Sequence, residues 1–283
     1  GAAHKPASLP RALCGALADS AMTGRSCAWW VVTDLDGTLM DDHYDWTPAE
    51  SVIRWLQSLA VPVIPCTSKT AEEVRLFRRK AALRDPYIVE NGGAIHGEDA
   101  AGEPWEQALG PGWRELKPHL QALEVSLGEP LRALDELSEE EGRQLLGLSG
   151  EALLQAQRRQ CSVPFVPPSE EARDRLAALA SARGLSVVQG NRMGHLLGRS
   201  VSKGNALAVL KQRLNAQGVS VLALGDSPND LPLLEVADIA VVVPGRDGPH
   251  PALLEAVNRG RFQLARAPHA EGWAEAVRRM LPI

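Results

Sequence analysis

The sequence predicts an α/β protein in which helices cover both faces of a parallel sheet and a second, α+β domain interrupts the chain. Three observations support this prediction. Apolar runs of strand length alternate with amphipathic runs of helix length before about residue 90 and again after about residue 200. Between these two parts the alternation loosens. The length of 283 residues suits about two domains, at roughly 150 residues each.

The first part of the predicted sheet begins with an apolar strand that ends at Val31-Val32-Thr33. Thr47-Pro48-Ala49-Glu50 then supplies an N-cap, a proline at the first helical position and an acid in the first turn. An apolar run, an amphipathic run and another apolar run follow, and Asn91-Gly92-Gly93 halts the last of them. We therefore expect helices over 48–60 and 70–82, and strands over 61–66 and 86–90.

The middle of the chain predicts a mixed α+β insert. Gly, Pro and acidic residues separate several amphipathic segments there, with short β-like pieces between them. The expected helices lie over 113–126, 138–147, 149–160 and 169–183, and the strands over 163–166 and 185–189.

The alternating pattern returns from about residue 200. The expected elements are helices over 203–217, 228–236, 250–258 and 271–281, and strands over 219–225, 238–243 and 261–265. Because two separated parts share one pattern, we expect residues 27–94 and 197–283 to form one core domain and residues 95–196 to form the inserted domain. The chain would cross between them near 90–97 and 190–200.

Composition favours a small-molecule partner. The formal net charge is −5 and no extended Lys/Arg run occurs, which argues against nucleic acid or an anionic membrane as the main partner. No stretch approaches the roughly 18 consecutive apolar residues of a membrane span, and we find no export signal. Four cysteines are scattered without metal-ligand spacing, so we expect neither a zinc site nor a disulfide framework; this suits a reducing, cytoplasmic location.

Residues 1–26 precede the first expected strand. Met22-Thr23-Gly24-Arg25 stands just before that strand. A tag remnant, an upstream extension and a disordered arm all remain open for this segment.

An acid pair follows the first strand, in Thr33-Asp34-Leu35-Asp36-Gly37-Thr38. Alternate side chains of a strand share a face, so Asp34 and Asp36 project together, or converge on one pocket if the strand ends between them. Such crowding of like charges calls for a cation or a shared proton. The alternative is a simple strand-end turn, with an Asp capping a helix and Gly37 at a positive φ.

A second acidic turn, Gly225-Asp226-Ser227-Pro228-Asn229-Asp230, follows another apolar run. It also fits a strand-to-helix turn with Asp226 or Ser227 as N-cap, and both interpretations can hold together. Asp34, Asp226 and a backbone carbonyl supply the few hard oxygen ligands that Mg²⁺ prefers. These acids are expected where ligands of a parallel sheet collect, beyond the carboxyl ends of the strands.

Two further residues fit a phosphate site. Thr67 follows the expected strand over 61–66. Lys203 opens a helix, where its charge adds to the unpaired backbone N–H groups of the helix start. Any single lysine is more often a solvated surface residue, but the order of acid pair, Thr67, Lys203 and acidic turn favours the site.

This ordered set resembles the four motifs of the haloacid dehalogenase-like superfamily of phosphatases. The insert looks like the type IIB cap of that superfamily. Further matches resemble the mannosyl-3-phosphoglycerate phosphatase family: Thr67-Ser68-Lys69-Thr70, Ile88-Val89-Glu90-Asn91-Gly92-Gly93, Gln189-Gly190-Asn191-Arg192 with His195, and Glu271-Gly272-Trp273. The resemblance covers roughly residues 28–283 and is weakest in the middle of the cap. It implies a Rossmann-like core.

The resemblance also implies roles. Asp34 would attack the phosphoryl group and form an aspartyl-phosphate. Asp36 would protonate the leaving oxygen and then take a proton from water. Asp34, Asp226 and the Asp36 carbonyl would bind Mg²⁺, supported by Asp230. Phosphate contacts would come from Thr67, Lys203 and Asn229.

Substrate choice is expected from residues near the cap. The candidates are Glu90, Asn91, Gly92, Arg192 and His195. An Arg fork suits a glycerate carboxylate, and His195 suits the same group or a sugar hydroxyl, although a structural His and a solvated Arg are equally common. Arg143, Arg158 and Arg159 are weaker candidates, as charges on a solvent-facing helix.

The chain departs from the family at Met193-Gly194, where we expect an aromatic residue, and at Ser162-Val163, where the family often has an acid. Both departures lie in the region expected to select the sugar, so they affect the substrate prediction rather than the predicted chemistry.

The leading function is thus a Mg²⁺-dependent phosphatase of mannosyl- or glucosyl-3-phosphoglycerate, whose product would be a compatible solute. A broader sugar-phosphate phosphatase is the alternative. A phospho-acceptor signalling module is more distant, since it lacks both the insert and the acid at Asp36. The oligomeric state is not predicted.

Overall fold

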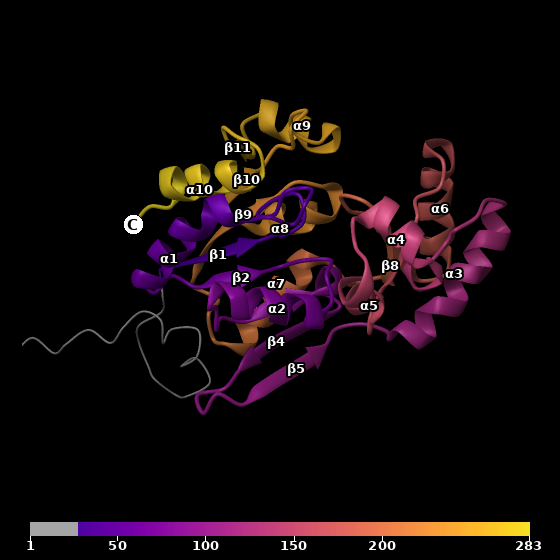
Figure 1. The fold of residues 1–283 in the computed structure, drawn as a ribbon, viewed down its shortest axis with the longest axis horizontal. Helices are drawn as coiled ribbons and strands as arrows, with labels where there is room; N and C mark the ends of the chain where they lie inside the picture. Colours follow the sequence, from indigo (N-terminus) through magenta and orange to yellow (C-terminus); the bar gives the residue numbers. More distant parts are fainter. Residues whose placement is uncertain (1–27) are drawn as a thin grey trace, which may run out of the picture.

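The computed structural model describes residues 28–283, so the extension expected over residues 1–26 lies outside the described residues. Five parallel strands form the central sheet in the order β11-β10-β9-β1-β2. This order runs down the picture in Figure 1. The strands are β1 (Trp29–Thr33), β2 (Val63–Pro65), β9 (Ser220–Gly225), β10 (Ile239–Val242) and β11 (Gln263–Leu264).

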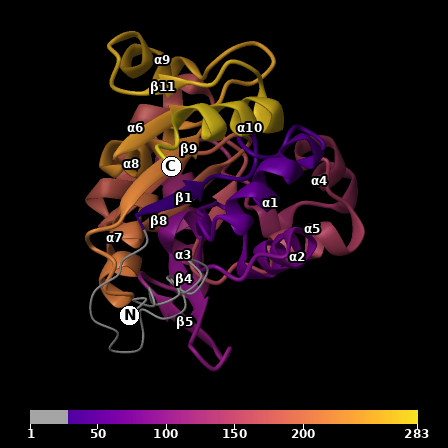
Figure 2. The same ribbon diagram turned by 90° about the vertical axis from the view of Figure 1, so that its left-hand side faces the viewer.

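Helices cover both faces of this sheet, as predicted. Because side chains of a strand alternate, Val31 of β1 packs on one face and Val32 on the other. The first face packs against α1 (Glu50–Ser58), α2 (Ala71–Ala81) and α10 (His269–Met280). The second packs against α7 (Lys203–Arg213), α8 (Leu231–Val236) and α9 (Pro251–Asn258). Figure 2 shows α10 beside α1 on the first face.

An antiparallel sheet extends the core beyond β2. It consists of β3 (Tyr87–Val89), β4 (Ala94–Glu98) and β5 (Pro104–Ala108), and a bridge between Cys66 and Ile88 joins it to the parallel sheet. Ile95 of β4 shares an apolar cluster with Val32 of β1. The hairpin of β4 and β5 therefore packs with the core, on the far side of the boundary expected between residues 94 and 95, and we place the crossing near 109–112. Alternate exposed and half-buried residues in the polar strand β5 hid it from the sequence pattern.

The inserted part has its own antiparallel sheet, of order β6-β8-β7, with α3 and α6 on one face. Its helices are α3 (Trp113–Leu127), α4 (Glu139–Leu146), α5 (Gly150–Gln157) and α6 (Glu170–Ala182), and its strands β6 (Val163–Phe165), β7 (Leu185–Gln189) and β8 (Gly194–Gly198). All four helices were expected, but β8 lies where we expected only a crossing. Within residues 28–283 there are also short 3-10 turns, η2 (Thr47–Ala49), η3 (Glu90–Gly92), η4 (Leu134–Glu136) and η5 (Pro228–Asp230).

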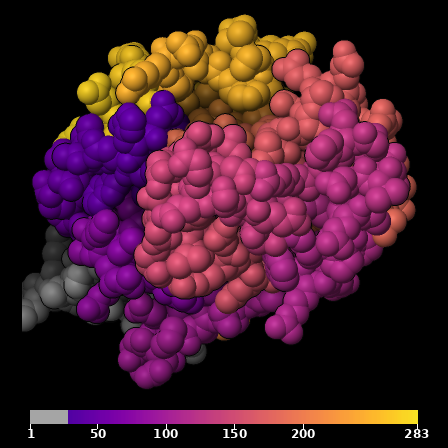
Figure 3. All heavy atoms as spheres, turned by 45° about the vertical axis from the view of Figure 1, so that its right-hand side comes forward, coloured from indigo at the N-terminus to yellow at the C-terminus, as the bar shows by residue number. Residues whose placement is uncertain are grey.

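The insert packs directly against the core. Figure 3 shows its pink atoms pressed against the indigo and purple atoms of the first core elements. Polar contacts join the two, for example Thr70 Oγ1 of the core donating to the Gln155 carbonyl of the insert at 3.0 Å. The site lies between them. Within residues 28–283, no helix combines the length and apolar character needed to cross a bilayer.

Candidate active site

Two neighbouring strands end in acids. Asp34 follows β1 directly, and its backbone N–H donates to the Leu224 carbonyl of β9 at 3.0 Å. Asp226 follows β9 directly. Since β1 and β9 are adjacent and parallel, their carboxyl ends bring the two side chains together. Thr38 Oγ1 lies 3.0 Å from a carboxylate oxygen of each.

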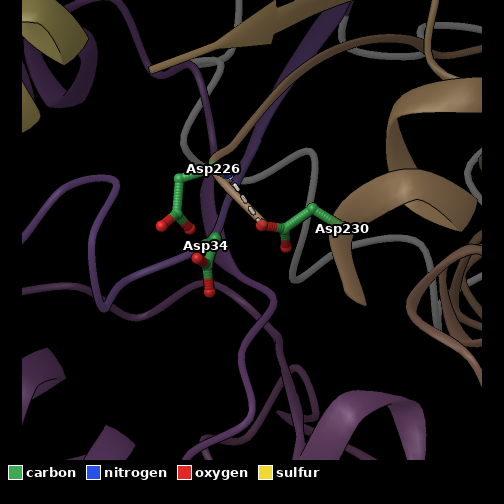
Figure 4. A group of neighbouring side chains, drawn as sticks. All are labelled: Asp34, Asp226 and Asp230. Atoms are coloured by element: carbon green, nitrogen blue, oxygen red, sulfur yellow. Dashed lines mark hydrogen bonds between the residues drawn. The ribbon is translucent and has the colours of Figure 1, made fainter. Parts of the chain in front are cut away.

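Asp230 completes a cluster of three carboxylates. Asp34, Asp226 and Asp230 each offer an oxygen within 4.8 Å of the others. Figure 4 shows the carboxylates of Asp34 and Asp226 close together, with Asp230 reaching in from the other side. One oxygen of Asp230 accepts the backbone N–H of Asp226 at 2.9 Å. This bond fixes the turn that carries both acids.

Lys203 supplies the buried positive charge of this cluster. Its Nζ lies 3.0 Å from Asp34 Oδ1 and 2.6 Å from Asp230 Oδ1, and its side chain is fully buried. Burial is the largest influence on the pKa of Asp34 and raises it, but attraction to Lys203 and hydrogen bonds with Asp226, Lys203 and Thr38 together lower that pKa overall. Asp34 is therefore ionised at neutral pH.

Among the described residues, no basic side chain forms an ion pair with Asp226. Burial, followed by repulsion from Asp34 and Asp230, raises the pKa of Asp226 well above its usual value. Burial and the Asp34 charge likewise raise the pKa of Asp230, to about 6. A divalent cation would relieve this repulsion, and closely spaced carboxylate oxygens are the donors that Mg²⁺ prefers. The donor set thus fits a hard divalent ion.

Asp36 stands apart from the cluster, toward the insert. Its Oδ1 lies 3.0 Å from Lys69 Nζ, and its side chain is 25% exposed. Burial raises the pKa of Asp36 although Lys69 opposes that rise. A carboxyl with a raised pKa and an accessible face is suited to donate a proton.

A cavity of about 70 Å³ lies between the core and the insert. Asp34, Asp36 and Asn229 line it on the side of the core. The polar part of the remaining lining consists of Lys69, Arg159, Arg192 and His195. Several apolar side chains complete it. Any ligand in this cavity contacts both parts of the chain.

Among the expected phosphate ligands, Thr67 and Lys203 are completely buried and do not border the cavity. Asn229 does, and its Nδ2 donates to Asn91 Oδ1 at 2.9 Å. Gly92 allows a close approach between two backbone segments. It has φ +95°, and an added Cβ would lie 2.1 Å from the Ser202 carbonyl oxygen. This approach seats the start of α7, and with it Lys203.

Glu90 also lies away from the cavity lining. Its buried carboxylate accepts the backbone N–H groups of Gln160 and Cys161 at 3.1 to 3.2 Å and the Ser162 hydroxyl at 2.8 Å. All three donors belong to the insert. Glu90 therefore joins the insert to the core rather than reaching into the cavity.

Arg192 and His195 both border the cavity. Arg192 Nη2 donates to the Asp42 carbonyl at 2.7 Å, and its guanidinium lies 5.0 Å from the Tyr44 ring centroid. Burial, followed by the charges of Arg159 and Lys203, lowers the pKa of His195 to about 3. The imidazole is therefore neutral, which suits hydrogen bonding to a hydroxyl better than pairing with a carboxylate.

The sequence pattern missed several cavity residues. Arg159 was expected on a solvent-facing helix, but α5 ends at Gln157 and the Arg159 side chain is 4% exposed. Lys69 belongs to the motif Thr67-Ser68-Lys69-Thr70, for which the sequence pattern predicted no role of the lysine. Its place in the loop after β2, two residues beyond Thr67, was an available signal. Tyr44, a non-glycine residue at φ 61°, carried no signal in the sequence.

The model of the haloacid dehalogenase-like hydrolase family matches residues 31–108 and 169–245. The fold is similar to that of Thermoplasma acidophilum 0175, with a TM-score of 0.64 and 17% identity over 88% of this chain and 96% of the other.

Two sugar phosphatases share the fold as well. The sucrose-phosphatase of Synechocystis sp. PCC6803, solved with sucrose and phosphate, has a TM-score of 0.61 and 19% identity over 89% of this chain and 97% of its own. The subclass IIB sugar phosphatase BT4131 has a TM-score of 0.64 and 15% identity over 88% and 97%. The TM-scores establish a common fold, a core with a cap, and at identities this low they establish the fold alone.

Proposed function

This chain belongs to the haloacid dehalogenase-like hydrolases, and from that premise we propose that it is a Mg²⁺-dependent phosphomonoesterase that works through an aspartyl-phosphate. One observation carries the proposal. Asp34 lies between the Lys203 ammonium and the Asp226 carboxylate, with Asp36 beside it at the cavity. The proposed nucleophile and acid thus both border one cavity, and the carboxylate cluster that would hold a cation includes the nucleophile.

In the first step, a carboxylate oxygen of Asp34 forms a bond to phosphorus while the bond from phosphorus to the ester oxygen breaks. Asp36 gives its proton to that leaving oxygen, which departs as an alcohol. In the second step, a water oxygen forms a bond to phosphorus and the bond to Asp34 breaks. Asp36, now a carboxylate, takes the water proton, and phosphate is released. Atoms and charge balance over the two steps.

The other buried residues hold the phosphoryl group. Lys203, whose Nζ contacts Asp34 although it does not border the cavity, would bind the phosphoryl oxygens and the charge that they gain in the transition state, with Thr67 as a second ligand. One such donor is typically worth about 2.7–4 kcal/mol. Asp34, Asp226 and the Asp36 carbonyl would hold Mg²⁺, supported by Asp230. The ion, when bound, neutralises charge on the phosphoryl oxygens and keeps the acids ionised.

For the substrate, we propose a phosphorylated sugar acid, mannosyl- or glucosyl-3-phosphoglycerate, giving the glycosylglycerate, a compatible solute. The basic residues Lys69, Arg159 and Arg192 beside the neutral His195 support a ligand that carries both an acid group and hydroxyls. A broader sugar-phosphate phosphatase is the second candidate. It is favoured by the apolar wall that Leu146, Leu148 and Met193 add to the cavity, because apolar side chains discriminate weakly between sugars.

The test is steady-state phosphate release from a panel of phosphate esters, with Mg²⁺ and with EDTA, compared by kcat/KM. We expect hydrolysis that stops in EDTA, a strong preference for the sugar-acid esters, and no turnover by Asp34→Asn in a protein that melts normally. Equal kcat/KM across the panel selects the broader phosphatase. Parent-like turnover by Asp34→Asn, or hydrolysis indifferent to EDTA, would contradict the mechanism.

A further inference from the structure

A row of four alternating charges runs from the insert to Asp36. Arg159 Nη1 lies 3.9 Å from Glu73 Oε1, Glu73 Oε2 lies 3.6 Å from Lys69 Nζ, and Lys69 Nζ lies 3.0 Å from Asp36 Oδ1. Arg159 belongs to the insert and the other three residues to the core. The row ends on the carboxyl that the reaction needs as its acid.

Burial makes these contacts stronger than ordinary surface ion pairs. The side chains of Arg159, Lys69 and Glu73 are only 4%, 10% and 11% exposed. Charges shielded from water interact over these distances far more strongly than exposed ones, whose pairs contribute little. The Tyr44 ring packs against the lysine, with Nζ 4.7 Å from its centroid. Lys69 therefore has little freedom to leave Asp36.

The pairing also directs the carboxyl of Asp36. Oδ1 is buried and forms an ion pair with Lys69 without hydrogen-bond geometry, whereas Oδ2 is not among the buried, unpartnered oxygens of the described residues. Asp36 borders the cavity, so Oδ2 is the oxygen open to a ligand. A carboxyl aimed at the leaving oxygen transfers its proton without a search over rotamers.

Arg159 is itself firmly seated. It donates to the Ser68 carbonyl at 2.5 Å and to Ser162 Oγ at 3.1 Å, and its Nε lies 3.5 Å from Glu90 Oε1. Glu90 also accepts from the three residues that follow Arg159. Arg159 can hold this place only while the insert lies against the core.

We propose that Lys69 and Arg159 are positioning residues for Asp36, Lys69 by direct contact and Arg159 through Glu73 and Lys69, so that the acid is aimed at the leaving group only when the insert is closed. The inference rests on the proposed phosphatase function. It gives the insert a second role besides substrate contact, because closure of the insert brings Arg159 into the row that orients the Asp36 carboxyl.

A neighbouring ion pair provides a matched control. Arg158 Nη1 lies 2.5 Å from Glu72 Oε1, so this pair also joins insert and core, one residue away from Arg159. Arg158 is 50% exposed and makes no contact with Glu73, Lys69 or Asp36. Arg158→Gln removes a contact across the same interface without touching the row.

The experiment compares kcat/KM for two esters with Mg²⁺ present: glycerol phosphate, whose alkoxide needs a proton to leave, and p-nitrophenyl phosphate, whose phenolate leaves without one. The variants are Lys69→Met, Glu73→Gln, Arg159→Gln and Arg158→Gln, with Lys69→Arg and Arg159→Lys as charge-conserving versions. Because general acids contribute about 10²–10⁴-fold, we expect the loss in Lys69→Met to be about 10- to 100-fold greater on the alkyl ester than on the aryl ester. We expect a smaller loss of the same kind from Arg159→Gln and Glu73→Gln.

Turnover of the aryl ester shows that each variant is folded and can still attack phosphorus. The charge-conserving versions should recover most of the alkyl activity, and Lys69→Met with Arg159→Gln should be no worse than Lys69→Met alone. Equal losses on both esters, or an equal alkyl-specific loss in Arg158→Gln, would overturn the inference while leaving the phosphatase intact. Failure of the parent to hydrolyse either ester would instead refute the proposed function.

Discussion

Replacing Lys203 by Met removes the buried cation that faces two carboxylates. The Nζ atom lies 3.0 Å from Asp34 and 2.6 Å from Asp230, and all three side chains are 6% exposed or less. Removing one partner of a buried pair costs about 3–5 kcal/mol, because the remaining charge stays out of water. For a chain of this length that loss lowers Tm by about 6–20 °C.

The loss depends on pH, with a sign fixed by the acids. In Lys203→Met, burial remains but the attraction that opposes it is gone, so the pKa values of Asp34 and Asp230 rise above those of the unfolded chain. The folded variant then binds protons more tightly than the unfolded chain, and its stability falls as pH rises above about 4. The deficit relative to the parent is therefore larger near pH 8 than near pH 5.

The assay is urea unfolding in EDTA, followed by circular dichroism at both pH values. Lys211→Met is the matched control: this lysine lies on the same helix, and its Nζ donates to the Val219 carbonyl at 2.6 Å. That variant should lose only about 1 kcal/mol, without pH dependence. Lys203→Met with Asp230→Asn should recover part of the loss. A deficit below about 1 kcal/mol in Lys203→Met, or one equal at both pH values, would refute the reasoning.

Two other predictions concern the core. Burial raises the pKa of Asp85 to about 6, and its Oδ2 accepts the Val63 N–H at 3.0 Å, a bond that an amide oxygen can keep. A carboxyl whose pKa is raised on folding lowers the stability of the protein as pH rises through about 4 to 6. Urea unfolding should therefore show that Asp85→Asn gains about 1–3 kcal/mol near pH 8 and nothing near pH 4. A gain that is the same at both pH values would contradict this. Gly92→Ala places a Cβ 2.1 Å from the Ser202 carbonyl at φ +95°. It should cost at least about 2 kcal/mol and lower kcat by displacing Lys203, whereas Gly102→Ala, at φ +79° with open space around it, should cost about 1 kcal/mol and leave kcat unchanged.

The strand-end acids explain how much could be predicted from sequence. Apolar runs that stop at Thr33 and Gly225 mark the ends of β1 and β9. In a parallel sheet those ends share an edge, so the proximity of Asp34 and Asp226 follows from the pattern. Helix starts were equally readable: Thr70 and Ser202 are N-caps that accept a backbone N–H, which places α2 and α7.

The hairpin of β4 and β5 shows where the pattern fails. Its strand β5 alternates exposed and half-buried residues, and only the apolar cluster that Ile95 of β4 shares with Ile88 shows that the hairpin belongs to the core. The roles of Glu90 and Arg159 could not be read either. Each depends on a residue about 70 positions away, as in the hydrogen bond from Gln160 to Glu90, and no local spacing encodes such a pair.

The sequence by itself determined the alternating α/β core and the positions of Asp34, Asp36, Lys203 and Asp226 along it, because strand ends and helix caps are local signals. Only the tertiary structure decided which side chains close the cavity above them. Arg159 reaches the cavity and its partners Glu73 and Glu90 because the insert docks on the core, and docking is set by the shape and charge of two surfaces that are distant in the chain.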